Sequence, residues 1–280
     1  MNKTELIDKV TRFEDEHKHP MNIDSMTADD LRVFADFLSS DYDISMNTIV
    51  TNMTLMRTVC NWVRKQGVTN NDPFFGYDMP KALYGTPYFL TIQERDQVLD
   101  ADLTDDAELA EYRDMFVFQC MVGCRHSDLV TFTPKNIIDG VLEYIPIKTK
   151  GKLGDVVRVP LIPKAMAILD GHDHGDDEPI FPKHYNFKFN DAIRRILKRA
   201  KVNRVVTVIN PKTRLEEKKP ISDVATSHLA RRTFIGNLYR MVKDPDLVAS
   251  MSGHAKGSVA FARYRVIDDD MKKSLVELIQ

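Results

Sequence analysis

A turn-rich segment at residues 70–87 divides this chain of 280 residues into two parts with different hydrophobic patterns. The segment NNDPFFGYDMPKALYGTP is rich in turn-forming residues and follows neither a helical nor a strand period, so it predicts a linker. A chain of this length can form two domains that each bury a core. We therefore expect one domain over residues 1–75, a linker over 76–90 and a second domain over 91–280.

The first part carries the apolar spacing of amphipathic helices. Asn47–Gln66 has apolar residues three and four positions apart, and Gly67 follows as a stop signal. Thr27–Ser39 opens with a capping residue and acids, which is typical of a helix N-terminus. With a further helix over Lys3–Glu16, we predict an all-α domain.

The second part mixes helical and strand signals. Thr91 opens a TIQE capping box, and Glu111–Gly123 is a strongly apolar helix. Val141–Ile147 and Val156–Leu161 are enriched in β-branched residues and predict strands on either side of a polar turn. Further expected elements are helices at Asn186–Ala200 and His228–Arg240, a hairpin around Val205–Ile209, and two short helices, one holding His254 and one closing the chain. The expected fold class is mainly α with a small β-sheet.

Charge is distributed unevenly along the chain, although the net charge is only −2. Residues 1–45 carry eleven acids against five bases, and Leu99–Tyr112 carries six acids and no base. Lys183–Lys219 carries twelve Lys or Arg residues against three acids. A basic block of this size can be a solvated surface, but nucleic-acid phosphates are the partner to which clustered cations bind most favourably.

Several protein classes are disfavoured by composition. No apolar run approaches the ~18 residues of a membrane helix, and the polar N-terminus does not resemble a signal peptide. Cys60, Cys120 and Cys124 fit neither a disulfide framework nor a zinc site, so we predict buried free thiols and a cytoplasmic location. In GHDHGDDE, the histidines and acids around His172 could bind a metal, but glycines and solvated acids favour an exposed loop.

Five polar residues carry the chemistry. Arg125 lies in GCRHSDL, His228 and Arg231 in SHLARRTF, His254 in SGHAKG and Tyr264 in FARYR. Two arginines can clamp a phosphodiester, histidines can hold or move a proton, and a tyrosine can attack phosphorus. Each residue also has a structural alternative: an Arg125–Asp128 pair, a surface pair of His228 with Arg231, a helix cap at His254 and a core position for Tyr264.

The three motifs resemble, in order, the boxes of the tyrosine recombinase (phage integrase) family, and are most similar to integrases of bacterial mobile elements. The resemblance covers Thr91–Gln280, and the helical first part resembles the family's core-binding, SAM-like domain. It implies a mixed α/β catalytic domain that forms, with the first domain, a C-shaped clamp around double-stranded DNA. Two features depart from the family pattern: Arg232 stands where many members have histidine, and Tyr264 follows His254 by ten residues.

The resemblance implies a site-specific recombinase that integrates or excises a mobile element. Tyr264 would form a 3′-phosphotyrosyl bond while Arg125 and Arg231 hold the phosphate, without metal, ATP or cofactor. His228 would assist proton transfer and His254 would hydrogen-bond the phosphate. There are two alternatives. A type IB topoisomerase would relax supercoils without a specific site, and a non-catalytic DNA-binding remnant would form no covalent adduct.

The resemblance also requires a lysine on a β-hairpin that protonates the leaving 5′-oxygen. Lys148 is preferred because threonine follows it, Lys150 is a close rival, and Lys152 lies in the same turn. Candidate contacts to backbone phosphates are cations of the basic block, the hairpin and the second motif: Lys150, Arg194, Arg195, Lys198, Arg199 and Arg232.

Partners follow from the same resemblance. We expect double-stranded DNA attachment sites, DNA-bending accessory proteins and a homotetramer on DNA. The apolar tail Lys272–Gln280 would dock on a neighbouring protomer, or alternatively pack in its own core. Residues 1–75 leave room for the core-binding domain alone, so the chain is either a simple recombinase or a fragment of a longer one.

Overall fold

The computed structural model describes residues 3–85, 87–149, 156–172, 175–242, 244–254 and 276–277. The chain divides into two compact units, one of Met1–Gly85 with Val208–Glu217 and one of Thr86–Thr207 with Lys218–Gln280. Among the described residues, helices are too short or too polar to cross a lipid bilayer. Tyr264, Lys150, Lys152 and the predicted docking tail lie outside these residues, except for Val276 and Glu277 of the tail.

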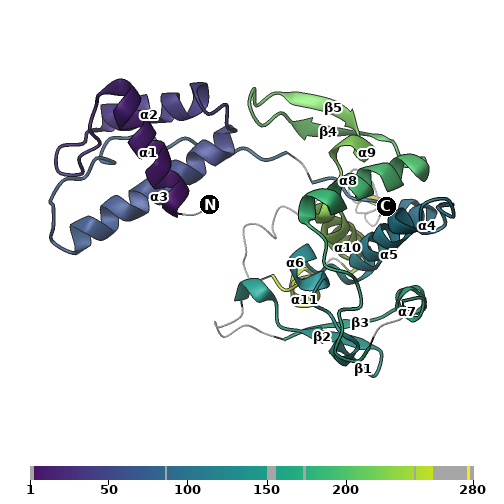
Figure 1. The fold of residues 1–280 in the computed structure, drawn as a ribbon. Helices are drawn as coiled ribbons and strands as arrows, with labels where there is room; N and C mark the ends of the chain where they lie inside the picture. Colours follow the sequence, from purple (N-terminus) through teal and green to yellow (C-terminus); the bar gives the residue numbers. More distant parts are fainter. Residues whose placement is uncertain are drawn as a thin grey trace. The chain divides into compact units, whose positions relative to one another are not determined.

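Three helices that pack against one another form the first unit: α1 (Lys3–His17), α2 (Ala28–Ser40) and α3 (Met46–Lys65) (Figure 1). They confirm the three predicted helices to within one or two residues. Thr27 and Asp30 form a reciprocal capping box at the start of α2, which explains why the chain turns into a helix there.

The core of this unit is aromatic. The ring centroid of Phe13 lies 5.3 Å from those of both Phe34 and Phe37, in edge-to-face arrangements. Phe13 and Phe34 are fully buried, as is Met53 of α3. Residues 208–217 also belong to this unit, where the backbone N–H of Met46 donates to the Pro211 carbonyl at 3.2 Å.

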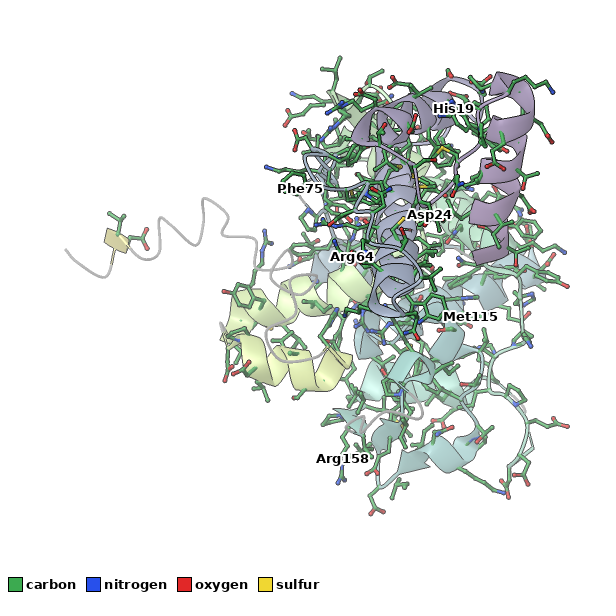
Figure 2. All side chains as sticks on the ribbon, turned by 90° about the vertical axis from the view of Figure 1, so that its left-hand side faces the viewer. His19, Asp24, Arg64, Phe75, Met115 and Arg158 are labelled. Atoms are coloured by element: carbon green, nitrogen blue, oxygen red, sulfur yellow. The ribbon has the colours of Figure 1, made fainter. Side chains whose placement is uncertain are left out.

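The second unit is built around one buried helix. Its helices are α4 (Ile92–Leu99), α5 (Ala107–Val122), α6 (His126–Leu129), α7 (Pro163–Asp170), α8 (Asn186–Arg199), α9 (Ile221–Val224), α10 (Ser227–Val242) and α11 (Pro245–Ser252). Helices α4, α7, α8 and α10 all pack on α5, and Met115 of α5, labelled in Figure 2, is fully buried. This explains why the second half of α5, Met115–Val122, is buried on every face rather than amphipathic.

Two small sheets are present, which confirms the mainly α fold class with little β-structure. β1 (Ile137–Ile138), β2 (Val141–Tyr144) and β3 (Val157–Pro160) form an antiparallel sheet in which Glu143 lies opposite Arg158, labelled in Figure 2, at 2.7 Å. β4 (Val205–Ile209) pairs with β5 (Glu216–Pro220).

The strand predicted to reach Ile147 ends earlier, at Tyr144. Pro146 has no N–H for the ladder, and the N–H of Ile147 donates to the Asp128 side chain at 2.9 Å. A 3₁₀ turn, η2 (Ile147–Thr149), follows in place of the strand and carries Lys148. Similarly, α11 ends at Ser252, so His254 lies just beyond a helix rather than within one, because Gly253 adopts a left-handed conformation.

Gly123 ends α5 at a point where the chain packs closely against α10. Its φ of 68° ends α5 in the left-handed region that favours glycine. A Cβ atom at this position would overlap the ring of Phe234, which is buried on α10. The close approach of α5 and α10 therefore depends on glycine at this position.

Substitution of Gly123 with alanine is expected to lower the free energy of unfolding by about 2–5 kcal/mol, since backbone strain and overpacking add. Gly140→Ala is the matched control. Gly140 has a φ of 73° but nothing within 4 Å of the added Cβ, so only the strain of about 1–2 kcal/mol applies. Urea denaturation of both variants checks the difference, and equal losses would contradict the proposed close contact.

Candidate active site

Arg125 lies at the junction of α5 and α6, where it forms the N-terminal cap residue of α6. The junction is held by Gln119, which is buried and donates from Nε2 to the Cys124 carbonyl at 3.0 Å. The Arg125 side chain is 24% exposed, and its Nη1 lies 4.0 Å from Oδ2 of Asp128. The Asp128 carboxylate is buried and partly balances the charge of the guanidinium.

Arg231 is the largest fully buried side chain among the described residues. Its Nη1 donates to the Gly123 carbonyl at 2.7 Å, and its Nη2 lies 3.0 Å from Nδ1 and 3.1 Å from Nε2 of His254. Because a buried guanidinium must be paired with acceptors, these contacts bring the end of α5, the first half of α10 and the turn after α11 together.

A pocket of about 340 Å³ opens where these elements meet. His228 lies one helical turn before Arg231 on α10, so both side chains face this pocket. Side chains from α5, α6, α8 and α10 line it: Gln119, Cys124, Arg125, His126, Ser127, Asn186, Ser227, His228 and Arg231. Both arginines border the same cavity, which suits an anion.

Both predicted histidines are held in the neutral form. Burial lowers the pKa of His254 to about 3, and the positive charges of Arg231, Arg125 and Lys148 act in the same direction. Burial also lowers the pKa of His228, with contributions from Arg232, Arg231 and Arg125. A neutral His228 can accept a proton near pH 7.

The positive charge of Lys148, on η2, contributes to the lowered pKa of His254, which indicates that Lys148 lies near this cluster. Asp128 anchors η2 through its hydrogen bond with the Ile147 N–H, so one buried carboxylate contacts both the Arg125 side and the Lys148 side of the site. Lys150 and Tyr264 belong to residues that the structure does not describe, and their predicted roles stay predictions.

The predicted DNA-contact residues of α8 form ion pairs on the surface. Arg195 contacts Asp106 at 2.8 Å, and Arg199 contacts Asp105 at 2.6 Å. Lys198 lies 2.8 Å from Asp223, and Arg194 lies 3.6 Å from Asp191. The acidic stretch Leu99–Tyr112 therefore neutralises part of the basic block that follows it in sequence.

Arg232 points to a different neighbour from Arg231. Its guanidinium lies 5.1 Å from the ring centroid of Tyr88, in a cation–π contact. The Tyr88 hydroxyl donates to the Val224 carbonyl at 2.9 Å, which fixes the ring on which Arg232 stacks. The residue that departs from the family pattern therefore packs on an aromatic ring.

The structure adds residues that the sequence analysis missed. Gln119 orients the Cys124–Arg125 junction, and Asn186 accepts from the Ser227 hydroxyl at 3.2 Å beside the pocket. Ser252 lies 2.9 Å from Nδ1 of His254. A polar residue within an apolar helix was a signal for Gln119, but Asn186 and Ser252 have no distinctive sequence context.

The described part of the chain holds no group of three His, Cys, Asp or Glu residues placed for a metal ion. His172 packs edge-on against Phe181 and lies 3.4 Å from Asp114, whereas Asp176 and Asp177 are exposed. Asp173 and His174 lie outside the described residues. The three cysteines are free and buried, as predicted.

The sequence model of the phage integrase family matches residues 88–271, and that of the phage integrase SAM-like domain matches residues 1–79. The chain belongs to the phage integrase family. It is a tyrosine site-specific recombinase by this membership. No curated protein sequence matches it.

Among the solved structures that share the fold of this tyrosine recombinase are three DNA complexes. The Tn1549 transposon integrase in complex with a circular intermediate DNA is 16% identical, with a TM-score of 0.70 over 99% of this chain and 94% of that chain. The XerH recombinase bound to its difH substrate is 14% identical, with a TM-score of 0.63 over 97% and 77%. A lambda integrase tetramer bound to a Holliday junction is 14% identical, with a TM-score of 0.61 over 95% and 72%.

Replacement of Asp128 with alanine is expected to lower the free energy of unfolding of this recombinase by about 1–3 kcal/mol, because the Ile147 N–H loses its acceptor. Asp177→Ala is the control, since Asp177 is 83% exposed and pairs with Lys135 at the surface. The control should change stability by less than about 0.5 kcal/mol. Urea denaturation measures both, and an Asp128→Ala variant as stable as the control would disprove the anchoring role.

Proposed function

We propose that this tyrosine recombinase cleaves and rejoins DNA through a covalent 3′-phosphotyrosyl intermediate at Tyr264, to integrate or excise a mobile element. The observation that carries the proposal is the convergence of Arg125, Arg231 and His228 on one pocket, with His254 bonded to Arg231. These are four of the five residues whose order in the sequence resembles the family motifs.

In the proposed reaction, the Tyr264 oxygen attacks the scissile phosphorus. The new bond joins the tyrosine oxygen to phosphorus, and the bond between phosphorus and the 5′-oxygen breaks. Arg125 and Arg231 hold the non-bridging oxygens as negative charge builds in the transition state. His228, whose lowered pKa keeps it neutral, accepts the tyrosine proton.

The departing 5′-oxygen takes a proton from a lysine, for which we propose Lys148. The positive charge of Lys148 acts on His254, which supports a place for Lys148 at the site. Strand rejoining reverses these steps: the 5′-hydroxyl attacks the phosphotyrosine, and its proton returns to the lysine. Because the phosphoester is conserved, the cycle needs no external energy source.

Double-stranded DNA attachment sites are the proposed substrate. The Tn1549, XerH and lambda integrase structures hold DNA, and the lambda integrase structure is a tetramer, which supports a tetramer of this chain on its sites. For α8 we propose that Arg195 and Arg199 exchange their surface carboxylate partners for backbone phosphates. Exposed ion pairs contribute little stability, so this exchange is inexpensive in free energy.

The nucleophile is tested with a nicked duplex that carries candidate attachment sites, in which the released fragment diffuses away and traps the adduct. The unsubstituted protein should form a covalent protein–DNA band on denaturing gels, and Tyr264→Phe should form none. Arg125→Lys should slow adduct formation by about 10²–10³-fold, as expected when one donor to transition-state charge is lost.

Tyr239→Phe is the matched control, because Tyr239 lies on α10 two helical turns beyond Arg231 and is partly exposed. It should form the adduct at the rate of the unsubstituted protein. An adduct that persists in Tyr264→Phe would show that another residue is the nucleophile. Relaxation of supercoiled DNA lacking these sites would favour a topoisomerase instead.

The general acid is tested by replacing the scissile 5′-bridging oxygen with sulfur. A thiolate is a much better leaving group than an alkoxide and departs without a proton, so loss of the general acid no longer matters. Lys148→Ala should be slow on the oxygen substrate and should regain the rate of the unsubstituted protein on the sulfur substrate. If Lys150→Ala shows this rescue and Lys148→Ala does not, Lys150 is the acid.

A further inference from the structure

Ser252 is a fully buried hydroxyl that contacts His254. It is the last residue of α11, and its Oγ lies 2.9 Å from Nδ1 of the His254 ring. The same Oγ lies 2.8 Å from the Val248 carbonyl and 3.3 Å from the Ala249 carbonyl. The hydroxyl therefore has three neighbours but only one proton to donate.

The Ser252 hydroxyl must donate its proton to a carbonyl oxygen. A carbonyl oxygen can only accept, so the 2.8 Å contact with Val248 requires the hydroxyl to donate there. The remaining contact with Nδ1 is then a hydrogen bond in which the ring donates and Oγ accepts. Arg231 does not decide the tautomer, because its Nη2 lies 3.0 Å from Nδ1 and 3.1 Å from Nε2 and so does not distinguish the two ring nitrogens. The assignment therefore rests on the hydrogen bonds of Ser252.

We propose that Ser252 is a positioning residue that fixes His254 in the tautomer with the proton on Nδ1. Ser252 then determines that Nε2 is the nitrogen whose protonation changes during the reaction. The tautomer itself is a property of the DNA-free protein, whereas its consequence for DNA cleavage depends on the proposed function.

This tautomer has a chemical consequence at the phosphate. With Nδ1–H bonded to Ser252, a neutral His254 has no N–H left for a phosphate oxygen, so it must first gain a proton on Nε2. The charged groups that face the ring are Arg231 from α10, Arg125 from the start of α6 and Lys148 from η2, and all three oppose protonation. A bound phosphodiester brings negative charge and raises the pKa of His254. DNA cleavage by this site is then coupled to proton uptake.

The tautomer is tested without DNA by ¹⁵N nuclear magnetic resonance of histidine ring nitrogens at pH 7. His254 signals are identified by their loss in His254→Gln. We expect Nδ1 to have the shift of a protonated nitrogen and Nε2 that of an unprotonated one. A protonated Nε2 in the unsubstituted protein would overturn the proposal, and this measurement needs no Ser252 variant to fold.

Ser252→Ala then shows whether the hydroxyl is the cause. Without Oγ, the two tautomers should exchange, so both ring nitrogens take intermediate shifts, and Ser252→Thr should restore the original shifts. Ser250→Ala is the matched control: Ser250 is exposed on the same helix and its hydroxyl donates to the Leu247 carbonyl at 2.7 Å. Unchanged shifts in Ser252→Ala would also overturn the proposal.

The coupling to proton uptake is tested by the pH profile of adduct formation on the nicked duplex. The Ser252→Ala ring can donate from Nε2 while neutral, so the rate of the unsubstituted protein relative to Ser252→Ala should fall as pH rises, by up to tenfold per pH unit. A constant ratio would refute the coupling. If neither protein forms an adduct, the proposed function fails, whereas the resonance result for the tautomer stands on its own.

Discussion

The buried guanidinium of Arg231 is the interaction on which the second unit depends. A charge that is 2% exposed is tolerated only where acceptors surround it, and here they come from Gly123 and His254 on separate segments. The packing of α10 on α5 and the turn after α11 therefore have to be correct before this charge can be buried. Burial of this charge therefore links the packing of the unit to the geometry of the site.

The helical part of the fold could be predicted from the sequence because its determinants are local. Thr27 and Thr91 form the capping boxes that their neighbours indicate, and the apolar spacing of α3 matches its buried face. The end of β2 was harder to predict, since it depends on the carboxylate of Asp128, 19 residues before Ile147 in the sequence, which accepts a hydrogen bond from the Ile147 N–H.

For the site, the sequence yields residue types and order but not their protonation or partners. The lowered pKa values of His228 and His254 arise from burial beside arginines of other segments. The role inferred for Ser252 rests on the directions of three hydrogen bonds, which no motif specifies. Likewise, the basic block and the acidic stretch were visible separately, but their pairing through Arg195 and Arg199 is a tertiary contact.

Cys124 occupies the wall of the pocket directly before Arg125, and it is fully buried. Burial raises the pKa of its thiol far above the usual range, so the reactive thiolate is absent from the folded site. Alkylating reagents should consequently spare Cys124 while α5 and α10 stay packed. Labelling of Cys124 would instead record the fraction of molecules in which that packing has opened, which makes this thiol an internal reporter of local unfolding.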